Sequence, residues 1–400
     1  MNKKICFLVF ILLISCSKKQ DQGDLPMNGE YFTIDLDGEK ENSIPFSTYF
    51  KSVRTIVLEA NEECLIGDFN ELQVFDGYLF LLDKRKANSL FVFDMEGNFV
   101  RKIGKIGSGP GEYMKVFDFT LDKEKKHIFL LDRPNRIHKY AFDGTYLFTL
   151  SLPIEENNLT FIQHYDGLIY ATTIAWRSSK DDYLLLKIDP DDGRILSKSL
   201  SIKYDKGWNE TFFSFQGRFF RAPMNNPPRY NQMFMDYIVS LGEEITPYIK
   251  LKSRNLTTTK DIESFRGKDG VRMNFDKIGE SSKIHGMHHY IENENYVYFK
   301  LIGNRRPFVV IFDKKTKETK LAERLYNDLI FKNHSNLMSG CFTFSDSMGA
   351  YEVLDTQSGR FGEFLNALSM NEMVPDLDRI DQLKQLDSES NPVIFFYEYK

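Results

Sequence analysis

A unit of four short strand-like segments occurs twice near the start of this chain, and no other feature limits its fold as strongly. The segment Phe80-Leu-Leu-Asp83 recurs as Phe129-Leu-Leu-Asp132, and Phe93-Asp94 recurs as Phe142-Asp143, both at an offset of 49 residues. In the first copy the turn-forming pair Asp76-Gly77 separates two apolar segments, as expected for a tight hairpin. Repeats of about 40–50 residues with four strands each are typical of β-propeller blades.

Weaker copies of the same unit continue along the chain. They occupy residues 164–193, 216–242, 296–313 and 341–359, after the two clear units at 72–104 and 116–152. The 35 Phe and 20 Tyr residues also favour strands, because aromatic side chains pack well on pleated surfaces. Six units predict an all-β fold, a six-bladed β-propeller. A pair of β-sandwiches is the alternative, since strand spacing alone does not distinguish the two folds.

The chain ends and one insertion add detail to this prediction. Both ends supply strand-like segments, at residues 31–35, 53–58 and 393–399, which predict a ring sealed by pairing between its ends. Residues 255–284 form an insertion between the fourth and fifth units, in which residues 259–266 predict a short capped helix. Apolar residues at helical spacing predict a second short helix over residues 376–387.

Several of these segments also carry a family resemblance. The stretch Gly107-Ser-Gly-Pro-Gly-Glu-Tyr113 with the strands before it, and Asp132-Arg-Pro-Asn135, resemble the NHL repeat. With the closing segment Asn391-Pro-Val393, the layout resembles the six-bladed propeller lipoproteins of the Bacteroides group over roughly residues 50–400. The resemblance implies a propeller fold and a location at the cell envelope, and it implies no particular activity.

The N-terminus has the pattern of a lipoprotein signal. Two lysines precede ten apolar residues, Ile5 to Ile14, which are too few to span a membrane, and then Ser15-Cys16. Residues 13–16 resemble a lipobox, so we expect residues 1–15 to be removed and Cys16 to be acylated. Ser17 is not the Asp that retains lipoproteins in the inner membrane, so we expect attachment to the outer membrane, on its periplasmic or its surface side. A plain signal peptide with a chance cysteine is the alternative.

The mature chain is then divided into two parts. Polar residues 16–30 have no periodicity and predict a flexible tether, and residues 31–400 form the propeller. Loss of two lysines takes the net charge from −5 to −7, which argues against nucleic acid as a partner. Cys64 and Cys341 remain as thiols, either bridged or unpaired, and sequence does not decide between these states.

No motif predicts a catalytic residue, a cofactor or a metal site. In the cluster His285-Gly-Met-His288-His289, a strand would point His288 away from the other two rings. The glycine-rich stretch from Gly104 to Gly111 lacks the lysine and the helix of a phosphate-binding loop. We interpret Asp83 and Asp132, at the ends of equivalent strands, as caps of the loops that follow them.

One charge pattern does suggest a ligand. The predicted loops between second and third strands carry 7 of the 18 arginines, and these loops lie on one face of a propeller. Guanidinium groups bind carboxylate, sulfate and phosphate in bidentate fashion, and the aromatic rings beside them stack on sugars. We therefore predict a docking face made of Arg85, Arg133, Arg136, Trp176, Arg177, Arg229, Tyr230, Arg305 and Arg306.

Three functions are open at this point. The first is a non-enzymatic binding or scaffolding module at the envelope, docking an anionic glycan, a peptide or an outer-membrane partner protein on the arginine-bearing face. The second is a propeller enzyme, a calcium-dependent lactonase-like hydrolase or a polysaccharide lyase, with its site at the central channel. The third is a purely structural subunit of an uptake complex, which would carry a flat apolar patch.

Overall fold

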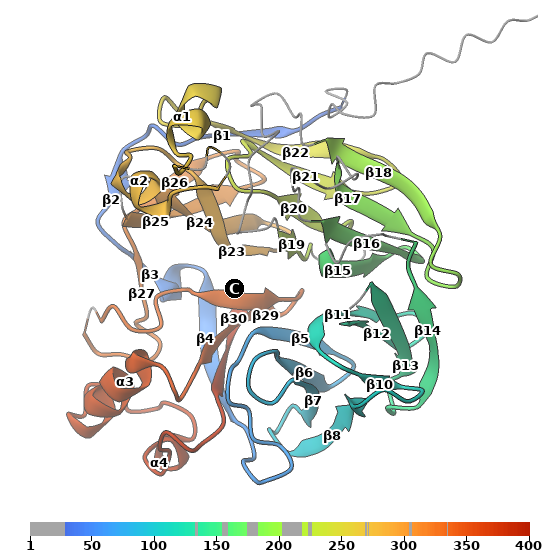
Figure 1. Ribbon diagram of the computed structural model, residues 1–400. Coiled ribbons are helices and arrows are strands. Elements are labelled where there is room, and N and C mark those ends of the chain that lie inside the picture. The colour runs from blue at the N-terminus through green and yellow to red at the C-terminus, as the bar shows by residue number, and fades with distance from the viewer. Residues whose placement is uncertain are drawn as a thin grey trace, which may run out of the picture.

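The computed structural model describes residues 29–132, 135–153, 159–173, 183–201, 218–222, 226–268, 270, 272–303, 306–333 and 335–400. Six sheets stand side by side in a ring (Figure 1). The first strands of neighbouring sheets contact one another around the central axis. The six-bladed propeller is therefore confirmed, and the pair of sandwiches is not observed.

Each blade begins with its innermost strand. Blade 1 contains β5 (Glu71–Phe75), β6 (Tyr78–Asp83), β7 (Ser89–Asp94) and β8 (Phe99–Ile103). Blade 2 contains β11 (Val116–Asp122), β12 (His127–Asp132), β13 (Arg136–Ala141) and β14 (Tyr146–Ser151), and blade 3 contains β15 (Leu159–Tyr165), β16 (Leu168–Thr173), β17 (Tyr183–Ile188) and β18 (Ile195–Ser201). Between blades 1 and 2 the short strands β9 (Lys105–Ile106) and β10 (Glu112–Tyr113) pair with each other.

Blades 4 and 5 each carry a fifth, outer strand from the N-terminal segment. Blade 4 contains β19 (Arg218–Phe220), β20 (Arg229–Asn231), β21 (Tyr237–Leu241), β22 (Ile245–Lys252) and the parallel β1 (Phe32–Asp35). Blade 5 contains β23 (Gly286–Glu292), β24 (Tyr296–Gly303), β25 (Arg306–Asp313), β26 (Thr319–Ala322) and the parallel β2 (Lys40–Glu41). The N-terminal segment thus covers the outer edges of two blades, which removes edges that invite aggregation.

Blade 6 closes the ring with strands from both chain ends, as predicted. After β28 (Phe342–Ser345) and β29 (Gly349–Leu354), the C-terminal β30 (Val393–Tyr399) lies between β29 and the N-terminal β4 (Phe50–Val57) (Figure 1). The register runs antiparallel from Val393 opposite Val57 to Tyr399 opposite Phe50. Ahead of β4, the strand β3 (Ile44–Pro45) pairs with β27 (Leu325–Tyr326), and a 3-10 turn follows at Phe46–Thr48.

The core is divided among the blade interfaces. Each of the six clusters of buried apolar side chains in the described residues lies between two neighbouring blades. Phe91 and Phe93 of β7, for example, pack against Ile394 of β30 and so join blade 1 to blade 6. The predicted hairpin at Asp76-Gly77 is present, with positive φ at both residues (53° and 78°), as a type I′ turn requires.

The helices match the sequence prediction only in part. The insertion contains α1 (Thr259–Ser264), with a capping box from Thr258 to Asp261, as predicted, and also α2 (Phe275–Glu280). The helix predicted over residues 376–387 shortens to α4 (Ile380–Leu383). The longest helix, α3 (Gly359–Ser369), was not predicted; it buries Phe361, Phe364, Ala367 and Leu368.

Candidate functional site

The loops between second and third strands lie at one end of the propeller, where the sequence predicts the arginine-rich face. Asp83 and Asp132 end the second strands of blades 1 and 2, and both are fully buried. Asp83 accepts four backbone N–H groups of the adjacent loops at 2.8–3.1 Å. Asp132 accepts the N–H of Lys115 at 2.9 Å. Both carboxylates therefore hold these loops, as expected from the sequence.

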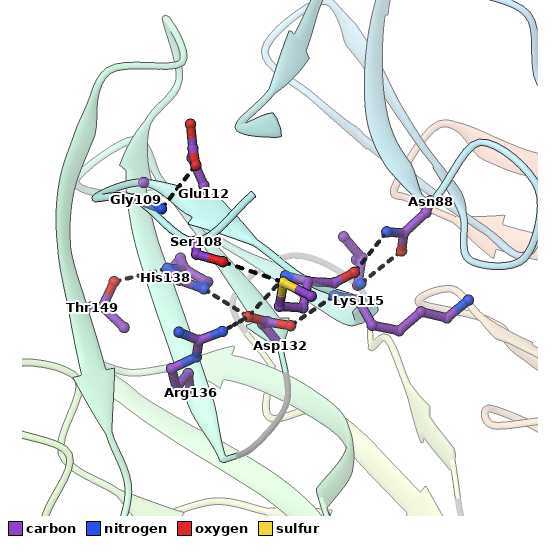
Figure 2. Close-up of polar contacts among 12 residues, drawn as sticks. Asn88, Ser108, Gly109, Glu112, Lys115, Asp132, Arg136, His138 and Thr149 are labelled. Carbon is purple, nitrogen blue, oxygen red and sulfur yellow. Dashed lines mark hydrogen bonds and ion pairs between the residues drawn. The ribbon is translucent and has the colours of Figure 1, made fainter. Parts of the chain in front are cut away.

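Two of the predicted arginines are engaged by carboxylates of the same face. Arg136 Nη2 lies 2.5 Å from Asp132 Oδ2, and Figure 2 shows Arg136, His138 and the backbone of Lys115 converging on this carboxylate. Arg85 donates from Nε and Nη2 to Asp68 at 2.7 and 2.6 Å. This hydrogen bond lowers the pKa of the Asp68 carboxyl. The charges of Arg85 and Arg136 are thus largely compensated within the protein.

Arg229 and Tyr230 lie in the interior and not on the predicted face. Residue 229 begins β20, and the two side chains are 5% and 1% exposed. Arg229 Nε and Nη2 lie 3.1 and 3.3 Å from the Glu292 carboxylate, which bridges blade 4 to blade 5. The sequence interpretation placed both residues in a solvated loop, whereas the loop ends before them.

The remaining predicted residues are distributed as follows. Arg306 begins β25, is exposed, and forms no ion pair with any residue that the structure describes. Arg133, Trp176, Arg177, Arg305 and the predicted lipidation site Cys16 lie outside the described residues. Within the described ranges, no helix has the length and apolarity needed to cross a membrane.

A large cavity opens at the opposite end of the propeller, where first strands turn into second strands. Its volume is about 770 Å³. The hairpins β11–β12, β15–β16 and β28–β29 contribute to its wall, together with the segment after β19 and the end of β5. We call it the channel-mouth cavity; its lining includes Phe75, Lys123, His164, Tyr165, Arg221 and Asp346.

Two cations in this cavity have no carboxylate partner. Lys123 and Arg221 have no carboxylate oxygen within 4.0 Å among the described residues, and each instead lies over an aromatic ring. Lys123 Nζ is 5.3 Å from the centre of the Phe75 ring, and the Arg221 guanidinium is 4.9 Å from that of Phe344. A guanidinium and an ammonium that share a cavity without counter-ions form a potential anion site.

Enclosure by the surrounding protein lowers the pKa of both cations. The Lys123 side chain reaches the solvent of the cavity, yet the surrounding protein reduces its hydration, which lowers its pKa to about 8. The charge of Arg221 lowers this pKa further, and the carboxylate of Asp346 opposes both effects. Desolvation likewise lowers the pKa of Arg221 to about 10, opposed by the carboxyls of Glu71 and Asp118 deeper in the channel.

Those deeper carboxyls compensate the cations only partly. Asp118 is buried beside Glu71, and burial together with the Glu71 charge raises the pKa of Asp118 well above its usual range. Both effects favour the neutral form of the Asp118 carboxyl. Lys84 Nζ lies 4.0 Å from Asp118 Oδ1 and opposes them. The buried carboxyl thus compensates the neighbouring cations less than a solvated carboxylate would.

The carboxylates at the rim of the cavity serve mainly its turns. Asp122 accepts the N–H groups of Glu124 and Lys125 at 3.1 and 3.0 Å, and Asp346 accepts those of Met348 and Gly349 at 2.8 and 3.0 Å. Asp166 and Glu124 also line the cavity from exposed turns. The cavity therefore offers both acceptors for hydroxyl groups and cations in its lining.

Sequence reasoning missed this site. Lys123 stands in the run Lys123-Glu-Lys-Lys126, which reads as a solvated turn, and Arg221 follows the shortest inner strand of the ring, in the irregular fourth unit. In the described part of the chain, no group of three or more His, Cys, Asp or Glu side chains is placed to hold a metal ion. The histidine cluster of residues 285–289 forms no such group.

Solved structures and family models place the fold among known proteins. A crystal structure of a Bacteroides fragilis protein described as exported aligns with a TM-score of 0.71 at 18% identity, covering 93% of this chain and 100% of that one. A DUF4221-family member from Bacteroides vulgatus aligns with a TM-score of 0.51 at 11% identity, covering 88% and 97%. No curated protein matches the sequence. The model of DUF4934, a domain of unknown function, matches residues 31–398, and the chain belongs to this family.

Proposed function

We propose that this protein is an exported, lipid-anchored binding module of the cell envelope that captures an anionic glycan in the channel-mouth cavity. The observation that carries this proposal is the presence of Lys123 and Arg221 in one cavity, with no carboxylate within 4.0 Å of either among the described residues. An anionic group bound there would supply the missing counter-charge. Its desolvation would be offset by bidentate contact with the guanidinium.

The shape and lining of the cavity favour a sugar acid over a peptide. A volume of about 770 Å³ falls within the roughly 300–1,000 Å³ that ligand sites usually have. Tyr165 offers a ring for stacking, and Gln163, Asp166 and Asp346 supply polar groups that suit hydroxyl ligands. A peptide that adds a strand to an open sheet edge would bind at an outer strand such as β8, β14 or β18, and not in this cavity.

The proposed location rests on the N-terminal pattern. Removal of residues 1–15 and acylation of Cys16 would tether the propeller to the outer membrane through residues 16–30. The relative from Bacteroides fragilis is described as exported, which is in keeping with this proposal. The arginine-bearing face, with Arg306 exposed, remains available as a second surface for a partner protein of the envelope.

Calorimetric titration of the purified protein tests the proposal. Uronic-acid oligosaccharides should bind, and neutral oligosaccharides of the same length should bind at least tenfold more weakly. The variants Lys123→Gln and Arg221→Gln should each weaken uronate binding roughly tenfold, the loss of one charge-assisted contact. Lys125→Gln, two residues along the same turn and outside the cavity lining, is the matched control and should bind as the wild type does.

The melting temperature provides a second readout. A ligand that binds only the folded state stabilises it by about 2.7 kcal/mol at a hundredfold excess over Kd. Uronate should therefore raise the melting temperature of the wild type and of Lys125→Gln fully, and that of each cavity variant by about half as much, because tenfold weaker binding leaves about 1.4 kcal/mol at the same concentration. Unchanged uronate affinity in Lys123→Gln and Arg221→Gln would reject the cavity as the site.

A further inference from the structure

Lys123 combines three properties that a simple anion receptor does not require. Its side chain is exposed inside a cavity of about 770 Å³, its Nζ lies over the apolar face of Phe75, and no carboxylate oxygen among the described residues is within 4.0 Å. A carboxylate in contact with a lysine would hold it protonated. Here the charge of Arg221 lowers the pKa of Lys123, and the more weakly acting carboxylate of Asp346 opposes it. Lys123 is thus arranged as an amine that can react.

We propose that Lys123 is a nucleophilic amine that condenses with a small carboxylate bearing an aldehyde or ketone, while Arg221 holds the carboxylate of the same molecule. The two groups line one cavity and interact electrostatically, and the proposal requires one small ligand to reach both of them. This inference goes beyond ligand capture, and it does not require the captured ligand to be a glycan. Desolvated lysines beside another cation are the arrangement used for imine chemistry with carbonyl compounds.

The step balances without a co-reactant. The unprotonated Lys123 Nζ attacks the carbonyl carbon with its lone pair, and a C–N bond forms while the carbonyl π electrons move to oxygen. Proton transfer gives a neutral carbinolamine. Its hydroxyl group leaves as water after protonation, the nitrogen lone pair forms the C=N bond, and a protonated imine results. No oxidant or reductant takes part, and hydrolysis reverses the step.

The protonation state of Lys123 sets the expected rate. Desolvation and the charge of Arg221 lower its pKa to about 8, so about one-tenth of the amine is unprotonated at pH 7. A lysine at the ordinary pKa near 10.4 has only roughly one part in 2,500 unprotonated. Lower basicity also reduces intrinsic nucleophilicity, so we expect Lys123 to react roughly tenfold faster than a solvated lysine, or more.

Reductive trapping tests the proposal on the intact protein. Glyoxylate with cyanoborohydride at pH 7 converts an imine into carboxymethyl-lysine, which peptide mass spectrometry locates. Early in the reaction, Lys123 should be labelled roughly tenfold more than Lys125 of the same turn. Acetaldehyde, which lacks the carboxylate, should show a smaller preference for Lys123. Arg221→Gln should reduce glyoxylate labelling at Lys123 roughly tenfold and leave Lys125 unchanged.

The variant Lys123→Arg separates this inference from the proposed function. It keeps a cation in the cavity, so uronate binding in the titration should persist, whereas no label can form at position 123. Equal labelling of Lys123 and Lys125 would overturn the inference, even if uronate still bound. A preference for Lys123 that is no larger with glyoxylate than with acetaldehyde would also overturn it, because Arg221 would then hold no carboxylate.

Discussion

The buried ion pair of Arg229 and Glu292 joins blade 4 to blade 5. Its removal tests whether Arg229 lies in the interior and not on the predicted arginine-bearing face. Glu292 is 1% exposed and accepts hydrogen bonds from Arg229 and from three further donors. Tyr248 and Tyr290 donate their hydroxyls at 2.6 and 2.7 Å, and Lys314 Nζ donates at 2.6 Å. The substitution Arg229→Met keeps an apolar side chain of similar length and removes the charge.

The expected loss of stability follows from these contacts. Arg229→Met removes two charge-assisted hydrogen bonds to Glu292, one to Ser240, and a cation–π contact 3.6 Å from the centre of the Tyr248 ring. Breaking a buried pair costs about 3–5 kcal/mol, and the remaining Lys314 places this case near about 3 kcal/mol. At about 2.1 cal/mol/K of unfolding entropy per residue, this lowers the melting temperature by about 4 °C.

The pH dependence of stability provides a second test of this ion pair. Burial by itself raises the pKa of Glu292, but the charges of Arg229 and Lys314 outweigh it and hold the folded pKa below its usual value. The stabilisation is therefore present above the unfolded pKa of about 4.3 and is lost as the pH falls through the lowered folded pKa. The difference between wild type and Arg229→Met should accordingly be largest near neutral pH and shrink below about pH 5.

Differential scanning fluorimetry across pH measures both quantities. Arg85→Met is the matched control, because its ion pair with Asp68 is at the surface with a 75% exposed arginine side chain, and it should lower the melting temperature far less than Arg229→Met does. Glu292→Gln combined with Arg229→Met should be less destabilising than the sum of the two single changes. Equal melting temperatures for Arg229→Met and Arg85→Met would refute the buried position of Arg229. A loss of uronate binding in Arg229→Met but not in Arg85→Met would instead show that Arg229 contacts the ligand.

Two further predictions concern the seam of the ring and the cysteines. Asn391 is 1% exposed, accepts the N–H of Ile66 at 2.7 Å, and donates to the carbonyls of Glu59 and Cys64 at 2.6 and 2.9 Å. Asn391→Ala should therefore lower the free energy of unfolding by about 2–3 kcal/mol, measured by urea unfolding. An unchanged urea midpoint would contradict this role of Asn391. Cys64 and Cys341 are both free thiols. Cys64 is fully buried, and this burial raises its pKa, whereas Cys341 is partly exposed. Iodoacetamide should therefore modify Cys341 in the native protein and Cys64 only after unfolding.

The fold could be predicted because its determinants are local and repeated. The 49-residue offset, the Asp76-Gly77 turn and the strand-like ends each act within one blade or at one seam, and all three appear in the structure. The helix α3 was missed because it lies beyond the sixth unit, which is predicted to end at residue 359, and no side chain caps its start at Ser358. Arg229 was misplaced for a related reason: β19 and β20 have only three residues each, too few to show alternation.

The site could not be predicted because no local pattern brings its parts together. Lys123 and Arg221 are nearly one hundred positions apart, and Asp346 is more distant still. Only the closed ring places the hairpins of blades 2, 3 and 6 around one cavity. A count of arginines per loop therefore predicts a charged face, but it does not show which charges have partners.

The two ends of the propeller differ in whether their cations already have carboxylate partners, and this difference bears on which end suits an anionic ligand. At the loop-bearing end, Arg85 and Arg136 already have carboxylates at 2.6 and 2.5 Å, so an incoming anion would have to replace an internal one and would gain little. At the channel-mouth end, an anion meets Lys123 and Arg221 with no such competitor among the described residues, and burial and Glu71 raise the pKa of the Asp118 carboxyl beneath them. The free energy available to an anionic ligand is consequently larger in the cavity than at Arg85 or Arg136 of the arginine-bearing face.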